Sequence, residues 1–377
     1  MSLPCLHSGM LAAAAQQFSD GRSLQMAVAG LTTCWLMGLV LNKAVTGSPG
    51  YEKGRGGTKV VAGALLLPLL IMLGSIAAML MVMGAVILEA NPIVWMGDFL
   101  AKDSFLCTKV CAYWIMQIAV FVIFAQFANE VLRWRQIIVR KVFHAAVLAL
   151  FVPAILLAET QRGHDGTLHS FLSLAFAVVL CIFILIEYVR VFMPISSLLG
   201  RDPFSAYYSL FLDERDRGRR FIFSHLYLIV GVAIPIWLSS LHIAIESGKS
   251  SHDEKWLFVR HFSDHVGLIT VGAGDASAAA IGSTCGHTRW SRSNKRTVEG
   301  SCAMLIASAI YTLLLYSYEA VTGDGCIAAY YEKYWPAVAF ALLGATFAEA
   351  FTNQNDNVVL PICTLALLIG VLQIFYN

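Results

Sequence analysis

The residues best suited to chemistry in this sequence are a few acids and cations embedded in apolar surroundings. Asp275 lies within the small-residue segment 271–282, and a carboxylate inside a membrane costs about 2.5–3.5 kcal/mol on insertion scales. That cost marks Asp275 as a candidate functional residue, although an internal ion pair would also explain it. Close helix packing explains the surrounding small residues; Gly272 and Gly274 would also let the backbone open and approach a ligand.

A basic segment follows Asp275 directly. Residues 282–300 combine four cations with several hydroxyls and glycines, the groups that together hold a phosphate. The segment is not a Walker A loop, which reads GxxxxGK[ST]. An ordinary cytosolic loop of a membrane protein would explain the cations equally well. The spacing of Lys295 and Glu299 would place both side chains on one helical face.

Two further polar segments carry acids. Residues 209–218 contain Asp213 and Asp216, which share a face if the segment is helical and could hold Mg²⁺ together with phosphates. A salt-bridged helix at the membrane surface is the alternative. Glu349 and Asp356 are spaced to form a polar stripe with Asn353, where the alternative is a polar turn between two spans.

Two histidine-containing features remain. Arg140 to His144 starts an apolar stretch and reads most simply as a membrane anchor, and neither His144 nor His225 is expected to act as a general base. The sequence shows neither a Ser/His/Asp or Cys/His nucleophile set nor histidines and cysteines with metal-ligand spacing. Acids, cations and glycine-rich backbone on one face are what phosphoryl transfer needs, because it proceeds by positioning and charge neutralisation.

Apolar helices must position these residues. The chain has 377 residues, of which 58% are apolar and 13% charged, whereas soluble domains average about 25% charged. This composition excludes a soluble globular enzyme, a disordered protein and a nucleic-acid-binding protein. We expect an all-α, polytopic transmembrane helical bundle with about ten spans (range 9–12), because each span needs about 20 apolar residues. The expected spans are 24–41, 60–88, 109–128, 142–158, 168–189, 222–245, 265–281, 302–318, 335–351 and 358–376.

The distribution of lysine and arginine predicts how these spans are oriented. Most of the 26 basic residues lie in the odd-numbered loops between spans, and such residues accumulate on the cytosolic side. The loops around 190–221 and 282–300 are therefore expected in the cytosol and the connection 247–264 on the opposite side. Residues 1–23 read as an N-terminal tail and not a cleaved signal, and 24–130 as N-terminal spans of unclear role.

Five ordered motifs in this sequence resemble those of the dolichol kinase family. They run from about Arg133 to the C-terminus, and their order and approximate spacing match the family. The motifs are Arg140-Lys-x-Phe-His144, Phe211-Leu-Asp-Glu-Arg-Asp216, Gly272-x-Gly-Asp275, Lys295-Arg-Thr-x-Glu-Gly300 and Glu349-Ala-Phe-Thr-x-Gln-x-Asp-Asn357. The resemblance implies that residues 131–377 form a polyprenol-kinase-like transmembrane catalytic region.

The resemblance also implies an activity and a location. Members of this family are multi-pass enzymes of the endoplasmic reticulum membrane with cytosolic catalytic loops. They transfer the γ-phosphate of CTP to the terminal hydroxyl of dolichol, and the product serves protein glycosylation and GPI-anchor assembly. The family's usual Lys-Lys pair is Lys295-Arg296 here, and residues 291–294 differ from the common version. The implied nucleotide-binding residues are Ser283, Gly286, Arg289, Lys295, Arg296, Thr297, Glu299 and Gly300.

The expected mechanism assigns the acids to a divalent cation and to the acceptor alcohol. Asp275, with Asp356 or Glu349, would bind Mg²⁺ or another divalent cation or orient the dolichol hydroxyl, and Asp213 and Asp216 are second candidates for the metal. CTP, a polyprenol lipid and the bilayer are the expected partners, without nucleic acid; oligomeric state is not indicated. The alternatives are another prenol or phytol kinase, a CTP-using cytidylyltransferase, or a transporter. A transporter predicts inverted repeats, which the sequence does not show.

Overall fold

The structure is a computed structural model of the full chain. The predicted spans 24–41 and 60–88, together with Asp213, Asp216 and Lys295, lie outside the residues that it describes. The described residues are 91, 93–94, 97–98, 101, 104–134, 136–160, 167–192, 222, 224–246, 254–291, 296–322, 325–352 and 355–376.

The described part of the chain is helical, and an isolated β-bridge is its other regular element. Each predicted span from 109–128 onward coincides with a helix, so the all-α prediction is confirmed. The elements are α4 (Ser104–Glu130), α5 (Gln136–Thr160), α6 (Thr167–Phe192), α9 (Ser224–Glu246), α10 (Glu254–Gly267), η2 (Leu268–Asp275), α11 (Ala276–Thr284), α12 (Val298–Thr322), α13 (Cys326–Phe351) and α14 (Asp356–Phe375).

Six helical stretches among the described residues are long and apolar enough to cross a membrane. They correspond to α4, α5, the continuous stretch from α10 to α11, α12, α13 and α14. Parts of α6 and α9 form shorter apolar helices. The chain is therefore a multi-pass membrane protein, and the total of about ten spans stays a prediction.

The chain divides into two compact units. One contains residues 105–172 and 227–377 among others, and it includes α5, α10 to α14 and most of α4 and α9. The other contains residues 22–104 and 173–226. In its described part, the main-chain N–H of Ile222 donates to Glu187 Oε1 at 2.5 Å. The residues whose contacts are described below all belong to the first unit.

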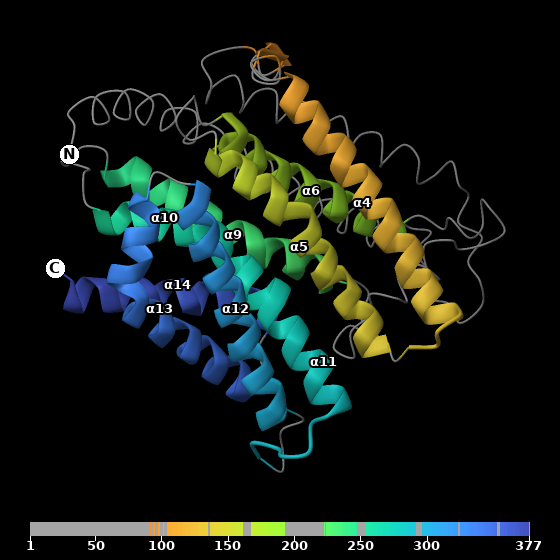
Figure 1. Ribbon diagram of the computed structural model, residues 1–377. Coiled ribbons are helices and arrows are strands. Elements are labelled where there is room, and N and C mark those ends of the chain that lie inside the picture. The colour runs from red at the N-terminus through yellow and green to blue at the C-terminus, as the bar shows by residue number, and fades with distance from the viewer. Residues whose placement is uncertain are drawn as a thin grey trace, which may run out of the picture. The chain divides into compact units, whose positions relative to one another are not determined.

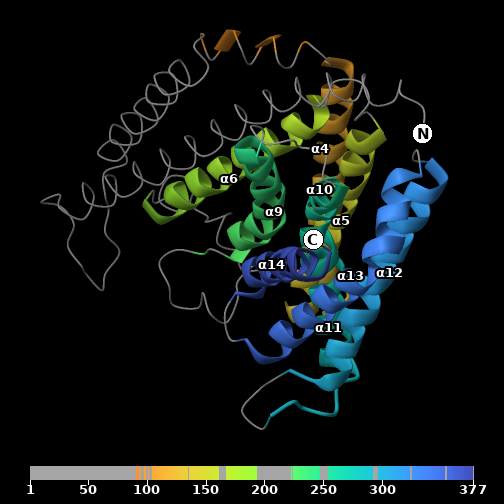
Figure 2. The same cartoon turned by 90° about the vertical axis from the view of Figure 1, so that its left-hand side faces the viewer.

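The elements α10, η2 and α11 form one continuous helical stretch in the first unit (Figures 1 and 2). Its middle part, η2, is a π-helix with nearly all of its residues buried, and it packs against α5, α12 and α14. Short π-helical segments inside α-helices are frequent at functional sites. Asp275 is the last residue of η2, so the π-helical backbone marks its position as a candidate functional site.

The prediction that residues 247–264 form a polar connection is wrong from Glu254 onward, because residues 254–264 form most of α10. Phe258 and Phe262 have no exposed surface and pack in one core cluster with Tyr331 and Tyr334 of α13. Local hydropathy missed this helix because its polar residues lower the average, whereas burial depends on the helices packed around it.

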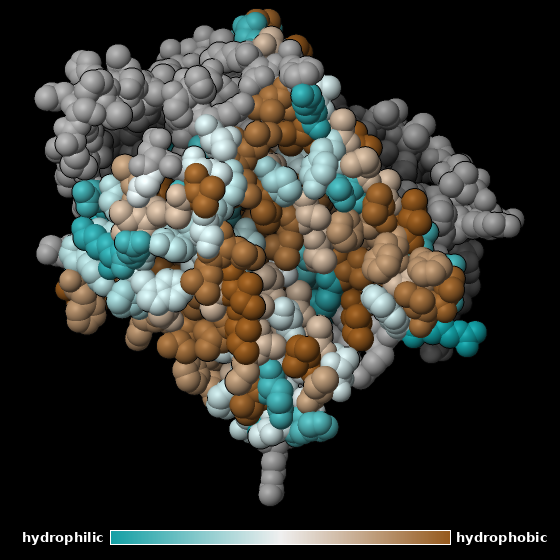
Figure 3. Space-filling view, in the orientation of Figure 1, coloured by the Kyte–Doolittle hydropathy of each residue, from teal (hydrophilic) through white to brown (hydrophobic). Residues whose placement is uncertain are grey.

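Apolar side chains cover much of the outer surface of the described helices (Figure 3). On α12 and α13 these side chains recur along the outward faces of helices whose opposite faces are buried. They include Ile306, Ile310, Leu313, Leu314, Phe340, Leu343 and Phe347. Large exposed apolar patches mark interaction surfaces, and on helices of this length the surface suits lipid.

Candidate active site

Asp275 lies beside two residues of α5 and pairs with one of them, Lys141. Lys141 Nζ lies 2.5 Å from Asp275 Oδ2, and His144 Nδ1 lies 3.6 Å from the same oxygen. His144 Nδ1 is also 3.0 Å from the carbonyl oxygen of Val271, which can only accept, so Nδ1 carries the hydrogen. The ion pair offered as an alternative explanation for Asp275 is therefore present. A paired carboxylate can still act on a substrate, because its charge is positioned and not removed.

Arg296 connects two further acids. Its Nη1 donates to Glu349 Oε1 at 2.5 Å and also to the main-chain carbonyl of Glu349, and its Nη2 donates to Asp356 Oδ2 at 2.7 Å. Burial lowers the pKa of the Arg296 guanidinium, but the charges of Asp356 and Glu349 raise this pKa above its ordinary value. Arg296 therefore stays charged and joins the end of α13 to the start of α14.

The ion pair of Lys141 with Asp275 lies close enough to Arg296 to interact with it, because the charge of Asp275 also raises the pKa of Arg296. The described residues thus bring three carboxylates, Asp275, Glu349 and Asp356, together with the cations Lys141 and Arg296. Each of the three acids is paired with one of the two cations, Asp275 with Lys141 and the other two with Arg296. We name these five side chains the carboxylate cluster.

The loop between α11 and α12 folds back on itself next to this cluster. Arg289 and Thr297 form an antiparallel bridge, and the N–H of Val298 donates to the carbonyl of Thr288 at 2.8 Å. Both carboxylate oxygens of Glu299 accept from the N–H of Thr288, at 3.0 and 3.2 Å. Glu299 therefore anchors the loop, and Arg289 is exposed on it.

Several predicted nucleotide-binding residues shape this loop. Thr297 Oγ1 accepts from the N–H of Gly300 at 3.2 Å and so caps the first turn of α12. A Cβ on Gly286 would meet Thr297 Oγ1 at 2.6 Å and would also collide with the carbonyl oxygen of Gly282. Ser283 Oγ donates to the carbonyl of Ala280 at 3.3 Å. These small residues let the loop turn tightly onto α11.

Two expectations about the site need correction. Arg296 and Thr297 are not helical and α12 begins at Val298, so the helical face expected to include Glu299 and Lys295 is not formed. Glu349 and Asp356 do not form a helical stripe, because α13 ends between them; Arg296 brings them together instead.

The two glycines before Asp275 serve packing. A Cβ on Gly272 would meet the Leu148 side chain of α5 at 2.6 Å. On Gly274 a Cβ would lie 2.8 Å from Ser308 Oγ of α12. The structure therefore supports the close-packing explanation for both glycines over the suggestion that they open the backbone for a ligand.

Sequence reasoning missed four residues that contact the site. Lys141 and His144 were read as an anchor and an ambiguous histidine, although their spacing places them on one helical face. Ser301 Oγ donates to Glu349 Oε2 at 3.2 Å, and Trp290 Nε1 donates to Ser301 Oγ at 3.0 Å. No local pattern could have indicated these last two contacts, because they join different elements.

Comparison with known proteins gives the family to which the chain belongs. The sequence model of the dolichol kinase family matches residues 40–306, a stretch that contains Lys141, Asp275 and Arg296. The chain belongs to the dolichol kinase family. The family match begins upstream of Arg133, and so includes part of the N-terminal segment whose role the motifs leave open.

Curated members of the dolichol kinase family from plants, mammals and yeast are similar to this chain. Dolichol kinase EVAN of Arabidopsis thaliana is 28% identical over 282 residues, which is 74% of this chain and 43% of that protein. Dolichol kinase of Homo sapiens is 30% identical over 295 residues, 75% of this chain and 48% of that protein. Dolichol kinase sec59 of Schizosaccharomyces pombe is 29% identical over 289 residues, which is 72% of this chain and 49% of that protein.

The chain spans about half the length of the curated relatives that it matches. No solved structure matches it. The arrangement of the carboxylate cluster therefore comes from this structure alone, and the family relationship comes from the sequence comparisons.

Proposed function

We propose that this chain is a dolichol kinase that transfers the γ-phosphoryl group of CTP to the terminal hydroxyl of dolichol. Its relatives bear that name, and the observation that carries the proposal is the carboxylate cluster. Three acids and two cations beside a glycine-containing basic loop supply what phosphoryl transfer requires, namely positioning and neutralisation of charge. The chain needs no nucleophile of its own, because the alcohol is the nucleophile.

Each part of the site has a role in this proposal. Arg289 and Lys295 of the loop neutralise the triphosphate. Arg296 is committed to two carboxylates and mainly positions them. Asp275, with Asp356 or Glu349, would hold Mg²⁺, which when bound neutralises charge on the phosphate oxygens. Asp213 and Asp216 are further candidates for the metal.

The reaction exchanges one P–O bond for another and transfers one proton. The dolichol oxygen attacks the γ-phosphorus, the bond between that phosphorus and the β–γ bridging oxygen breaks, and CDP leaves with the bonding electrons. The hydroxyl proton passes to a carboxylate of the cluster, because an alcohol does not ionise near neutral pH and needs a positioned base. Lys141 keeps Asp275 in place during this step.

The apolar outer faces of the helices fit a lipid acceptor. The isoprenoid would lie between helices or along their surface, and its hydroxyl would reach the carboxylate cluster at the end of the bundle. We place the protein in the endoplasmic reticulum membrane with the loop between α11 and α12 in the cytosol, where CTP is present. The product would serve protein glycosylation and GPI-anchor assembly.

Assaying the purified chain in detergent with CTP and dolichol tests the proposal. We expect Asp275→Asn and Lys295→Ala each to reduce turnover by about 10²-fold or more, because each removes a charge that stabilises the transition state. Lys333→Ala is the matched control, since Lys333 is exposed and pairs with Glu254 away from the cluster. Turnover near that of the wild type in both test variants would refute the assignment.

A substrate panel separates the related activities. The wild-type protein is incubated with CTP or ATP and with dolichol, shorter polyprenols and phytol, and the nucleotide product is identified. A kinase releases CDP, whereas a cytidylyltransferase releases pyrophosphate. Release of pyrophosphate, or a preference for phytol over dolichol, would replace the present proposal with that activity.

A further inference from the structure

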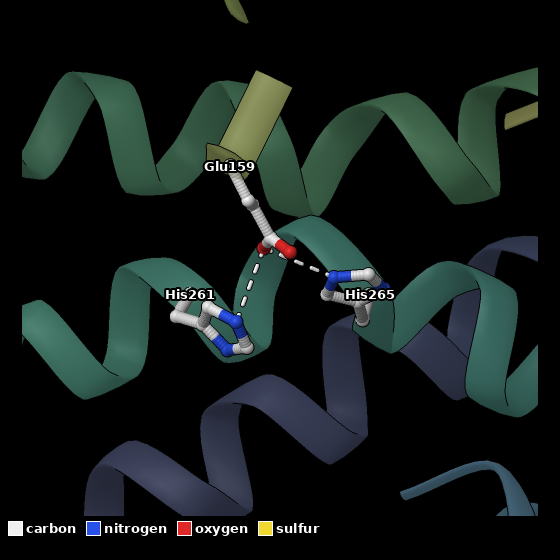
Figure 4. Close-up of side chains that lie close together, drawn as sticks. All are labelled: Glu159, His261 and His265. Atoms are coloured by element: carbon white, nitrogen blue, oxygen red, sulfur yellow. Dashed lines mark hydrogen bonds and ion pairs between the residues drawn. The ribbon is translucent and has the colours of Figure 1, made fainter. Parts of the chain in front are cut away.

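A second polar cluster lies on α5 and α10, toward the opposite end of α5 from Lys141. Glu159 lies in the last turn of α5, whereas Lys141 lies near the start of that helix. His261 and His265 lie on α10 with the spacing of one helical turn. Figure 4 shows the Glu159 carboxylate directed toward both imidazole rings. Nothing in the proposed kinase reaction uses these three residues.

One oxygen of Glu159 lies close to one nitrogen of each histidine ring. Glu159 Oε1 lies 3.1 Å from His261 Nε2 and 3.0 Å from His265 Nε2. Both histidine side chains are fully buried, and the Glu159 side chain is 5% exposed. Burying two histidines and a glutamate in one place is expensive unless their polar atoms are engaged, so the arrangement calls for an explanation.

The other nitrogen of each ring is oriented by a tyrosine. His265 Nδ1 lies 3.0 Å from the hydroxyl of Tyr311 on α12, and His261 Nδ1 lies 3.3 Å from the hydroxyl of Tyr331 on α13. Histidines that bind metals commonly have their second nitrogen hydrogen-bonded in this way, which fixes the ring. The two Nε2 atoms are therefore held facing the same point.

From this geometry we propose that Glu159, His261 and His265 bind a divalent transition-metal ion of the Zn²⁺ class. Their ligand atoms all lie within 4.8 Å of one another. Ligand atoms around a tetrahedral zinc with bonds of 2.0–2.1 Å are about 3.3 Å apart, close to the separations of Glu159 Oε1 from the two histidine nitrogens. Two imidazoles and one carboxylate are a ligand set that zinc accepts.

Glu319 of α12 is a candidate for a fourth ligand. Glu319 Oε1 of α12 lies 3.2 Å from His261 Nε2, so a small movement would bring it to the same ion. Two carboxylates and two neutral histidines would offset the charge of a dication. The ion would then join α5, α10 and α12 and serve to hold these helices together.

This site is distinct from the one proposed for Mg²⁺. His265 and Asp275 belong to the same continuous helix, and the π-helical segment η2 begins after His265 and ends at Asp275. The ligands also differ, because imidazole nitrogen suits zinc and other transition metals, whereas carboxylate oxygens suit Mg²⁺. The two ions would not compete for the same residues.

Metal analysis of the full-length protein tests the inference. The protein is purified in detergent without a histidine tag, and bound zinc is measured by mass spectrometry. We expect about one zinc per chain, a lower melting temperature after treatment with 1,10-phenanthroline, and recovery on adding Zn²⁺ but not Mg²⁺. Wild-type protein that holds no zinc, and whose melting temperature Zn²⁺ does not change, would overturn the inference in favour of a metal-free hydrogen-bonded cluster.

Two variants assign the metal to these residues. Glu159→Gln and His265→Gln should retain less than about a tenth of the zinc, because each loses a ligand. Glu254→Gln is the matched control, since it removes an exposed glutamate from the same helix as the histidines. Full zinc content in both test variants would show that the ion lies elsewhere. If either variant does not fold, the chelation and Zn²⁺ add-back experiment on the wild type still decides the question.

Discussion

Arg296 donates from two guanidinium nitrogens to carboxylates on two different helices. The planar fork of arginine makes this possible, because its donors are fixed in direction and separated in space, whereas the ammonium group of lysine is a single point. Because the side chain is only 18% exposed, solvent screening does not remove the interaction. Arg296 thus positions Glu349 and Asp356 relative to each other.

Replacing Arg296 with lysine should therefore be damaging although it conserves charge. We expect Arg296→Lys to leave one carboxylate without its donor, to lower stability by about 1–3 kcal/mol and to reduce kcat/KM by tenfold or more. Thermal unfolding and steady-state kinetics with CTP and dolichol measure the two effects. Arg133→Lys, at an exposed position after α4, is the control, and equal kinetics for the two variants would contradict this role.

Trp290 joins the basic loop to the carboxylate cluster through Ser301. Its ring also packs 5.4 Å, centroid to centroid, from Phe351. We expect Trp290→Phe to keep the ring contact and lose the hydrogen bond, at a cost of about 1 kcal/mol and a several-fold higher KM for CTP. Trp290→Ala should be worse, because it loses both; a similar KM in the two variants would assign the effect to the hydrogen bond alone.

At the scale of helices, close approach of backbones places the start of α14. A Cβ on Gly231 of α9 would collide with the main-chain carbonyl of Asn357, and a Cβ on Gly267 would meet Val232 Cα at 2.6 Å. Small residues of this kind let membrane helices pack backbone to backbone. Because Asp356 precedes Asn357 directly, this packing also sets the position of a cluster carboxylate.

Gly231→Ala tests that connection between packing and the site. The new methyl group should displace the first turn of α14 and weaken the pair between Arg296 and Asp356, with lower melting temperature and lower kcat as the result. Gly370→Ala is the control on α14, because nothing lies within 4 Å of its Cβ position and alanine favours helix by about 1 kcal/mol. Equal behaviour of the two variants would show that the close approach does not matter.

At the scale of the whole molecule, the two polar clusters lie at different ends of the helices. The carboxylate cluster uses the start of α5 and the end of α13, whereas Glu159 and Glu319 lie near the ends of α5 and α12. The distribution of lysine and arginine predicts that the loop between α11 and α12 lies in the cytosol. The connection from α12 to α13 then lies on the opposite side of the membrane.

Cysteine labelling in sealed microsomes tests this orientation. Cys285 follows α11 and Cys326 begins α13, and both are exposed. A membrane-impermeant thiol reagent should label Cys285 in intact vesicles and Cys326 only after permeabilisation. Cys285→Ser and Cys326→Ser identify the labelled sites by loss of signal. Labelling of Cys326 in intact vesicles, with Cys285 protected, would reverse the assigned orientation.

The sequence by itself determined the class of the protein and the position of most helices. Hydropathy is a local property, since each span must contain its own apolar residues, and every predicted span among the described residues coincides with a helix. The scarcity of charge also singled out Asp275, Glu349, Asp356 and the basic loop, because polar groups within membrane helices are costly and stand out.

Only the tertiary structure decided which of these groups meet. The pairing of Lys141 with Asp275, and of Arg296 with acids on both sides of the turn between α13 and α14, joins residues far apart in the chain. The same holds for α10, whose histidines meet Glu159 although the sequence reads as a polar connection. Such contacts depend on how whole helices pack, and a local pattern carries no information about the partner that packing supplies.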